Sequence, residues 1–392
     1  MSIALPKLGL IVNPVAGLGG AVGLKGSDGE STQRQALAMG ARPRAPERAI
    51  KALQRLAAID SPFELLTCAG SMGSEEAASC GLEFTVLEGP SGLTTPRHTR
   101  DAARAMAEQG VDLLLFAGGD GTACDICEAV GDRLTVLGIP AGVKIHSGVY
   151  AISPDAAGRL AAEFVRGRSF ETMAAEVMDQ DEEALRKGRV SVRLHGYLHI
   201  PRHRALTQGT KSSSAVGESV AARIAAADVV RKMEAGRTYI IGPGTTTREV
   251  MAALGLAGTL VGVDVVRDSQ LLVKDAGEQQ ILELIKGRDT AIVVTVIGGQ
   301  GYLFGRGNQQ ISARVIREVG ADNIIVVATR QKLNSLRWRG LLVDTGDDEV
   351  DAMLGGYVRI VTGTGEQALC KVGDPDLTVQ VQVPIEPPGS GD

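Results

Sequence analysis

The stretch Val111-Asp-Leu-Leu-Leu-Phe-Ala117 runs directly into the loop Gly118-Gly-Asp-Gly-Thr122. An apolar run that is hydrophobic on both faces and ends at glycines is typical of a buried strand in a parallel sheet. The residues after the loop, 123–130, can form a helix, so the stretch predicts a strand, a tight loop and a helix. Glycines leave backbone N–H groups uncovered, and the helix N-terminus adds partial positive charge, so phosphate groups can approach this loop closely.

One carboxylate, Asp120, lies in the middle of this loop. An anion is out of place beside phosphate unless it binds a metal, orients a hydroxyl or takes a proton. The alternative is a tight turn in which Asp120 only caps the following helix. We therefore treat Asp120 as the candidate catalytic residue.

Composition excludes several classes of function. The net charge of −5, without a basic tail or basic helix, argues against nucleic acid as the main partner, and an aromatic content of 3% argues against a base-stacking surface. Five cysteines, odd in number and without a pattern, indicate a reducing compartment. The sequence shows no signal-peptide pattern and no apolar run of membrane-spanning length. We expect a cytoplasmic protein that contacts no membrane.

The order of predicted elements divides the chain in two. Residues 1–150 alternate strand and helix, which predicts an α/β domain with a doubly wound parallel sheet. Residues 151–375 are expected to form a second lobe, in which β-rich segments at 172–202 and 340–372 surround a further α/β run at 237–330. Residues 376–392 are rich in Pro, Gly and Ser and are predicted to be disordered.

Glycine-bearing loops follow several predicted strands, and open α/β sheets bind ligands at that edge. The loops are 13–20, 118–122, 141–147, 242–248 and 298–310, which together suggest one large phosphorylated ligand or two ligands. The candidate nucleotide- and phosphate-binding residues are Asn13, Pro14, Gly17, Gly118, Gly119, Gly121, Thr122, Gly142, Lys144, Ser147, Gly242, Gly244, Thr245, Thr246, Thr247, Arg248, Asn308 and Gln309.

Several of these residues have a second interpretation. Lys144 is either a counter-charge for phosphate or a solvated surface lysine. Arg248 is either a counter-charge or a residue at a helix N-terminus that pairs with an acid. Asn308 and Gln309 either read a base or ribose by hydrogen bonds or cap the helix predicted after Ser312. No metal ligand is assigned.

In combination the motifs resemble a known superfamily. The loop Gly118-Gly-Asp-Gly-Thr122, with Asn13-Pro14 after the first strand and a Pro-x-Gly loop after the next, resembles the NAD kinase, diacylglycerol kinase and phosphofructokinase superfamily. More narrowly, four segments look like the ATP-NAD kinase and acetoin-catabolism protein X branch: Asn13-Pro-Val-Ala-Gly17, Gly138-Ile-Pro-Ala-Gly-Val-Lys-Ile-His-Ser147, Gly242-Pro-Gly-Thr-Thr-Thr-Arg248 and Gly305-Arg-Gly-Asn-Gln-Gln-Ile-Ser312.

This resemblance implies a phosphate donor at the Gly118 loop, with Asp120 near the acceptor hydroxyl, in a cleft between two lobes. The implied reaction moves a phosphoryl group from ATP, or from polyphosphate, to the 2′-hydroxyl of NAD in the presence of Mg²⁺. Small-molecule nucleotides are then the partners, and a homo-oligomer, a dimer, is expected. Two alternatives stay open: a kinase of another small polyol or lipid, and a nucleotide-binding accessory protein without turnover.

Overall fold

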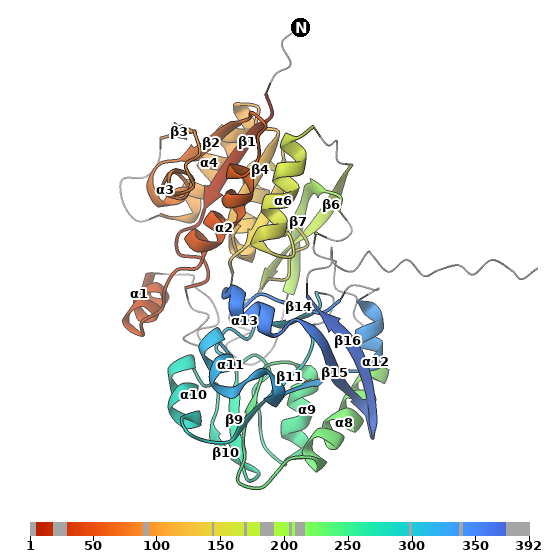
Figure 1. Cartoon of the computed structure of the whole chain (residues 1–392). Coiled ribbons are helices and arrows are strands. Elements are labelled where there is room, and N and C mark those ends of the chain that lie inside the picture. Colours follow the sequence, from red (N-terminus) through yellow and green to blue (C-terminus); the bar gives the residue numbers. More distant parts are fainter. Residues whose placement is uncertain are drawn as a thin grey trace, which may run out of the picture.

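The computed structural model describes residues 5–18, 30–88, 94–142, 145–167, 171–180, 192–203, 206–207, 216–297, 300–336 and 340–373. Within these ranges the chain folds into two lobes, each built around its own seven-stranded sheet (Figure 1). Both sheets are mainly parallel and carry helices on both faces, which confirms the predicted α/β class. The C-terminal tail predicted to be disordered lies outside the described residues.

The first sheet has the strand order β3-β2-β1-β4-β5-β7-β6. Strands β1 to β5 run parallel in its centre and on one side. β4 is buried along its whole length because helices cover both of its faces, which explains its uninterrupted apolar sequence. The strands are β1 (Lys7–Val12), β2 (Glu64–Cys68), β3 (Thr85–Leu87), β4 (Leu113–Gly118), β5 (Thr135–Pro140), β6 (Thr172–Gln180) and β7 (Val192–Pro201).

Helices cover both faces of the first sheet. One face is covered by α2 (Ala45–Ala57), α3 (Ser74–Ser79) and α6 (Pro154–Val165), and the other by α4 (Pro96–Glu108) and α5 (Asp120–Val130). α2 and α6 cross closely because small residues line their contact. A Cβ atom at Gly158 of α6 would lie 2.2 Å from the carbonyl oxygen of Ala52 in α2. The short helices α1 (Glu30–Ala38) and η1 (Gly70–Met72) complete this lobe.

The second sheet has the strand order β10-β9-β8-β11-β13-β15-β16, in which β8, β11, β13 and β15 are parallel and the outer strands are antiparallel. Helices α10, α11 and α13 cover one face, and α8 and α9 cover the other. The strands are β8 (Thr238–Ile241), β9 (Asp264–Arg267), β10 (Gln270–Val273), β11 (Thr290–Val294), β13 (Ile324–Val327), β15 (Gly356–Gly363) and β16 (Glu366–Val372). The helices are α8 (Val216–Arg231), α9 (Thr245–Ala253), α10 (Glu278–Ile285), α11 (Ala313–Val319), η2 (Ala321–Asn323), α12 (Arg330–Ser335) and α13 (Asp348–Met353).

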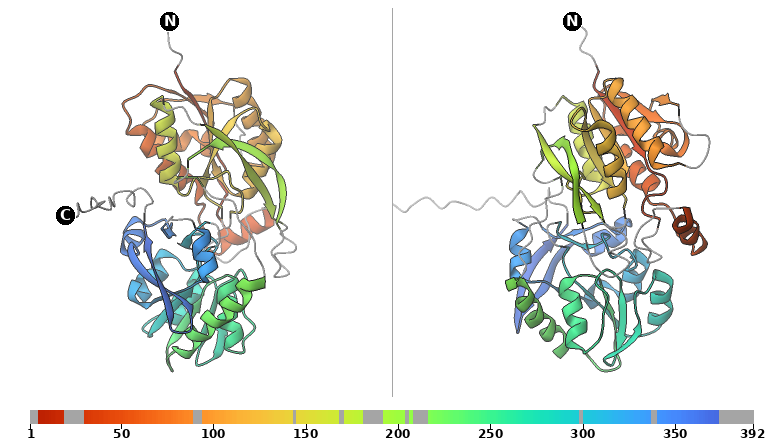
Figure 2. Two further views of the ribbon diagram at one scale, coloured as in Figure 1. Left: turned by 90° about the vertical axis from the view of Figure 1, so that its right-hand side faces the viewer. Right: turned by 180° about the vertical axis from the view of Figure 1, so that it is seen from behind.

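The β-rich segment 172–202 lies in a different lobe from the one that the sequence suggested. β6 and β7 form the expected antiparallel hairpin, but β7 pairs with β5 at the edge of the first sheet (Figure 2). Ala175, Val177 and Leu198 of this hairpin are buried in the core of the first lobe. The alternation of polar and apolar residues predicts the hairpin, but it does not predict which sheet has a free edge to receive it.

A two-stranded sheet of β12 (Tyr302–Phe304) and β14 (Leu342–Val343) lies where the lobes meet. The sequence predicted a polar glycine loop at 298–310, whereas the structure has the buried strand β12 within it. Tyr302 and Leu342 pack into the core of the first lobe, so the lobes share apolar contacts. Among the residues that the structure describes, no helix is long and apolar enough to cross a membrane.

Candidate functional site

Three glycine loops of the first lobe pack against one another at the carboxyl ends of β1, β4 and β5. Asn13 after β1 donates from Nδ2 to the hydroxyl of Thr122 in α5, at 2.9 Å. A Cβ atom at Gly17 would lie 2.2 Å from the carbonyl oxygen of Ala141, and one at Gly142 would lie 2.7 Å from the Cα atom of Gly119. These glycines therefore allow close contact between loops.

Asp120 joins the β4 loop to the β5 loop. Its Oδ2 atom accepts a hydrogen bond from the backbone N–H of His146 at 2.7 Å, and its Oδ1 atom accepts one from the N–H of Ser147 at 3.0 Å. The Nδ1 atom of His146 lies 3.2 Å from the same Oδ2 atom, within hydrogen-bond distance of the carboxylate. α5 begins after Gly119 without a side-chain cap, so Asp120 does not cap its own helix. The carboxylate instead holds residues 146 and 147 in place.

A cavity of about 280 Å³ lies between the two lobes. Ile145 and His146 line it from the first lobe, and Gly244 and Thr245, at the start of α9, line it from the second. The side-chain amide of Gln300 donates to the carbonyl of Ile145 at 2.8 Å and ties the two walls together. The other lining residues are Pro243, Leu260, Val261, Thr295, Val296, Ile297, Arg306, Gly307, Asn308 and Lys332.

The structure brings only part of the predicted site to this cavity. Gly244, Thr245 and Asn308 line it directly, whereas Asp120 and Ser147 lie one layer behind His146. The predicted residues of the three interlocked loops do not line the cavity; they are Asn13, Pro14, Gly17, Gly118, Gly119, Gly121, Thr122 and Gly142. Lys144 lies outside the described residues.

The remaining predicted residues have structural contacts of their own. Gly242 lies at the buried end of β8, and Thr246 and Thr247 are buried in the first turn of α9. Arg248 is exposed and does not line the cavity. Asn308 accepts from the N–H of Gly305 and donates to the carbonyl of Leu303, and Gln309 donates to the carbonyl of Gly305. Both amides therefore shape the loop after β12.

Sequence reasoning missed two cations in the cavity wall. Lys332 is only 9% exposed and donates from Nζ to the hydroxyl of Thr295 at 3.3 Å. Arg306 is 2% exposed, and its guanidinium lies 4.9 Å from the ring centroid of Tyr302. A signal for Lys332 was available, because it follows β13 at the same edge of the second sheet where Gly244 follows β8.

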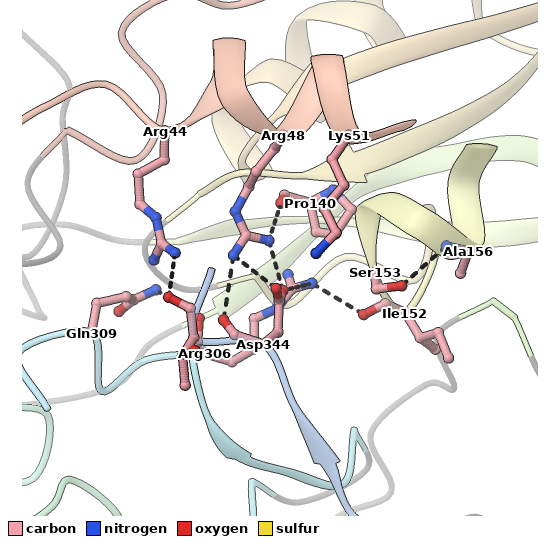
Figure 3. A network of polar contacts seen from close by, with 12 residues as sticks. Arg44, Arg48, Lys51, Pro140, Ile152, Ser153, Ala156, Arg306, Gln309 and Asp344 are labelled. Carbon is pink, nitrogen blue, oxygen red and sulfur yellow. Dashed lines mark hydrogen bonds and ion pairs between the residues drawn. The ribbon is translucent and has the colours of Figure 1, made fainter. Parts of the chain in front are cut away.

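A buried ion cluster next to the cavity joins the lobes (Figure 3). Arg48 of α2 binds Asp344 through both side-chain oxygens, at 2.6 and 2.9 Å, and also donates to the carbonyl of Pro140. Arg306 approaches the same carboxylate at 3.1 Å and donates to the carbonyl of Ile152. Arg44 adds a hydrogen bond to the carbonyl of Thr345.

The electrostatics of this cluster follow from burial and from the excess of cations. Burial by itself raises the pKa of Asp344, but Arg48 and Arg306 outweigh it, so the pKa lies below the ordinary value. Burial, together with the neighbouring Arg48, lowers the pKa of Arg44 to about 10. The cluster therefore stays ionised at neutral pH.

The implied Mg²⁺ finds no cage of protein ligands in the described part of the chain. No group of three or more His, Cys, Asp or Glu side chains there is arranged to hold a metal ion. Both carboxylate oxygens of Asp120 already accept backbone N–H groups. The described donor set therefore does not fit a resident metal.

Comparison with known proteins identifies the family. Residues 8–169 match the ATP-NAD kinase N-terminal domain, and residues 234–372 match the ATP-NAD kinase C-terminal domain. No curated protein matches the chain.

Two solved structures from Bacillus anthracis str. Sterne, one named "a putative diacylglycerol kinase" and one named a diacylglycerol kinase, are 16% and 14% identical to this chain. The alignments cover 44% of this chain and 46% and 47% of those chains, with TM-scores of 0.23 and 0.21, so this chain spans less than half of their length. Because the two domain models cover most of both lobes, this chain belongs to the ATP-NAD kinase family.

Proposed function

We propose that the protein is an NAD kinase-like phosphotransferase that moves a phosphoryl group from ATP, or from polyphosphate, to the 2′-hydroxyl of NAD and forms NADP. The observation that carries the proposal is the interlobe cavity. A glycine loop at the start of α9 and the loop held by Asp120 face each other across it, in a chain of the ATP-NAD kinase family. Its apolar lining, including Leu260, Val261 and Ile297, suits a base or a ribose.

In this proposal each residue of the site has a defined task. The first-turn N–H groups of α9 point positive charge toward a bound phosphate. Asp120 orients the loop that carries His146, and a direct role at the acceptor hydroxyl requires its carboxylate to become accessible when the substrates bind. The polyphosphate donor brings any Mg²⁺ with it, since the described residues offer no cage for a metal.

A second candidate is a nucleotide-binding accessory protein without turnover. The observation in its favour is that Asp120 is 8% exposed and that both of its carboxylate oxygens accept backbone N–H groups, with His146 also beside Oδ2. A general base must be within reach of the proton that it takes. The apolar lining would also suit a lipid acceptor, and a small polyol is the remaining alternative.

The test is an assay of product formation. Purified protein is incubated with Mg²⁺, ATP or polyphosphate, and NAD, and NADP is measured with an NADP-specific dehydrogenase. Parallel reactions with polyols and diacylglycerol vesicles use labelled ATP to detect a different product. NADP formation supports the first proposal. Binding of ATP and NAD without any phosphorylated product supports the accessory protein, and a labelled polyol or lipid would replace NAD as the acceptor.

The oligomeric state and the location remain predictions. We propose a cytoplasmic homodimer, for which the exposed side chains of Tyr357 and Leu369 on the edge hairpin of β15 and β16 offer an apolar surface. Light scattering coupled to size exclusion measures the mass directly. A single species of monomer mass at micromolar concentration would contradict the dimer.

A further inference from the structure

We propose that Lys332 contacts a phosphate group of the bound nucleotide and that the wall around it is the anion subsite of the interlobe cavity. This inference rests on the proposed nucleotide site and assigns a ligand chemistry to one of its walls. None of the motifs in the sequence included Lys332. The assignment depends on what surrounds this lysine in the folded chain.

The first step is the position of the ammonium group. Lys332 lies in α12, whose N-cap Thr329 accepts from the backbone N–H of Lys332 at 3.2 Å and fixes the start of the helix. The side chain extends into the cavity wall, where Nζ donates to the hydroxyl of Thr295 at the end of β11. The ammonium group therefore lies at the cavity wall rather than in bulk solvent.

The second step concerns Gly244, which lies next to Thr295. A Cβ atom at Gly244 would lie 2.5 Å from Cγ2 of Thr295, so the start of α9 touches the residue that holds the ammonium group. α9 has nine residues, and no side chain caps its first turn. Its first N–H groups and the Lys332 ammonium thus present positive charge to the same wall.

The third step is the charge of the lining as a whole. Among the described residues that line the cavity, Lys332 and Arg306 are cations, and none is an aspartate or a glutamate. Arg306 contacts the carboxylate of Asp344, and Lys332 donates one of its hydrogen bonds to the hydroxyl of Thr295. An anionic group in the cavity would therefore meet cations and no carboxylate in the described lining, and the low dielectric would strengthen its charge-assisted hydrogen bonds.

The ligand chemistry follows from the shape and from the charge together. The apolar walls accommodate a base or ribose, and the Lys332 wall accommodates a phosphate attached to it. A phosphate could come from the donor nucleotide or from the pyrophosphate of NAD. The cavity is smaller than many ligand sites, so it fits one nucleotide unit better than two.

The experiment uses Lys332→Met, which keeps the length and apolar body of the side chain and removes the charge. The matched control is Lys286→Met, a change at an exposed lysine at the end of α10 that does not line the cavity. Affinities for ATP, NAD, tripolyphosphate and adenosine are measured by titration calorimetry. We expect Lys332→Met to weaken binding of at least one phosphate-bearing probe by about tenfold or more, with adenosine affinity unchanged. Lys286→Met should bind every probe like wild type.

The arms of the experiment separate the two sources of phosphate. A loss for ATP and tripolyphosphate alone assigns the wall to the donor, and a loss for NAD alone assigns it to the acceptor. Unchanged affinity for all probes in a variant that melts like wild type would overturn the inference, as would a wild-type protein that binds none of the phosphate-bearing probes.

Two further outcomes keep the test decisive. Where Lys332→Met fails to fold, Thr295→Val removes the oxygen that positions the ammonium group with little change in shape. It should weaken binding of the same probes several-fold, and an unchanged affinity counts against the inference.

NADP formation is measured separately. A wild-type protein that binds phosphates through Lys332 but forms no NADP sinks only the proposed reaction, whereas NADP formation with Lys332→Met affinities equal to wild type sinks only this inference.

Discussion

At the scale of single residues, the most informative finding is the way in which Asp120 is used. A carboxylate in a glycine loop suggests either catalysis or a helix cap, and the structure shows a third use, as an acceptor for the backbone of residues 146 and 147. Both oxygens are needed for this, which changes the result expected from an amide replacement.

Asp120→Asn should lower both stability and rate. An asparagine offers one acceptor oxygen, so its NH₂ group would face one of the two N–H donors at 146 and 147, at a cost on the order of 1–3 kcal/mol in unfolding free energy. A catalytic role would add a fall in the rate of NADP formation of roughly 10²–10⁴-fold. Thermal melting and the NADP assay separate the two effects, with the exposed Asp132→Asn as the control. A stable variant with full activity removes Asp120 from both roles.

Glu76 provides a second test at this scale. It is 3% exposed on α3, its Oε2 atom has no hydrogen-bond partner among the described residues, and burial raises its pKa to about 7. The folded protein therefore holds this proton from about pH 4.5 to 7 while the unfolded chain releases it, so stability falls as pH rises through that window.

Glu76→Gln should remove the loss of stability that wild type shows as the pH rises. The variant is expected to be more stable than wild type at pH 8 by on the order of 2 kcal/mol and nearly equal to it at pH 4. Urea unfolding at both pH values measures the difference. The same gap at pH 4 and pH 8 would show that Glu76 does not titrate in this range.

At the scale of elements, the glycine loops serve first to pack against one another. The β4 and β5 loops meet at Gly119 and Gly142 without room for a side chain on either. The same contact sets the position of His146 in the cavity wall, because Asp120 follows Gly119 directly. Loop packing and ligand binding are therefore coupled through a few residues.

Gly142→Ala should separate the two loops. The added methyl group would lie 2.7 Å from the Cα atom of Gly119, and backbone cannot move aside as cheaply as a flexible side chain. We expect a loss of roughly 1–3 kcal/mol in stability and weaker binding of ATP and NAD. Gly363→Ala is the control, since its Cβ atom would meet only the Glu366 side chain, at 3.3 Å. Nucleotide affinity equal to wild type would show that the cavity does not depend on this contact.

At the scale of the whole molecule, the two lobes are joined by an ion cluster as well as by apolar contacts. Arg48 from the first lobe and Arg306 from the second bind the same carboxylate, on Asp344. Removing one partner of a buried pair is costly because it leaves the other charges uncompensated. The Arg48–Asp344 ion pair also fixes α2 of the first lobe against the segment that follows β14.

Asp344→Ala should cost on the order of 3–5 kcal/mol in unfolding free energy. Asp348→Ala is a close control, because Asp348 is exposed and pairs with Lys51 of α2, the helix that also carries Arg48. The loss of this exposed pair should cost less than about 1 kcal/mol. The depressed pKa of Asp344 adds a pH signature: its stabilisation is present above the ordinary carboxyl pKa and is lost as pH falls through the lowered value. Equal costs for the two substitutions would show that the buried cluster contributes no more than a surface pair.

The sequence by itself determined the fold class, the positions of the main loops and the family. These depend on local pattern: a buried parallel strand must be apolar on both faces, as in β4, and a tight loop at its end must contain glycine. Asp120 was singled out in the same way, because its loop is contiguous in the sequence, and its catalytic role stays a prediction.

Only the tertiary structure decided where the β6–β7 hairpin pairs, which glycine loops reach the cavity, and that Lys332 and Arg306 line it. Arg48 and Asp344 are separated by 296 positions, and Lys332 and Thr295 by 37. The physical reason is that burial and pairing energies depend on which surfaces meet after the chain has closed these long loops. Local periodicity contains no information about those distant partners.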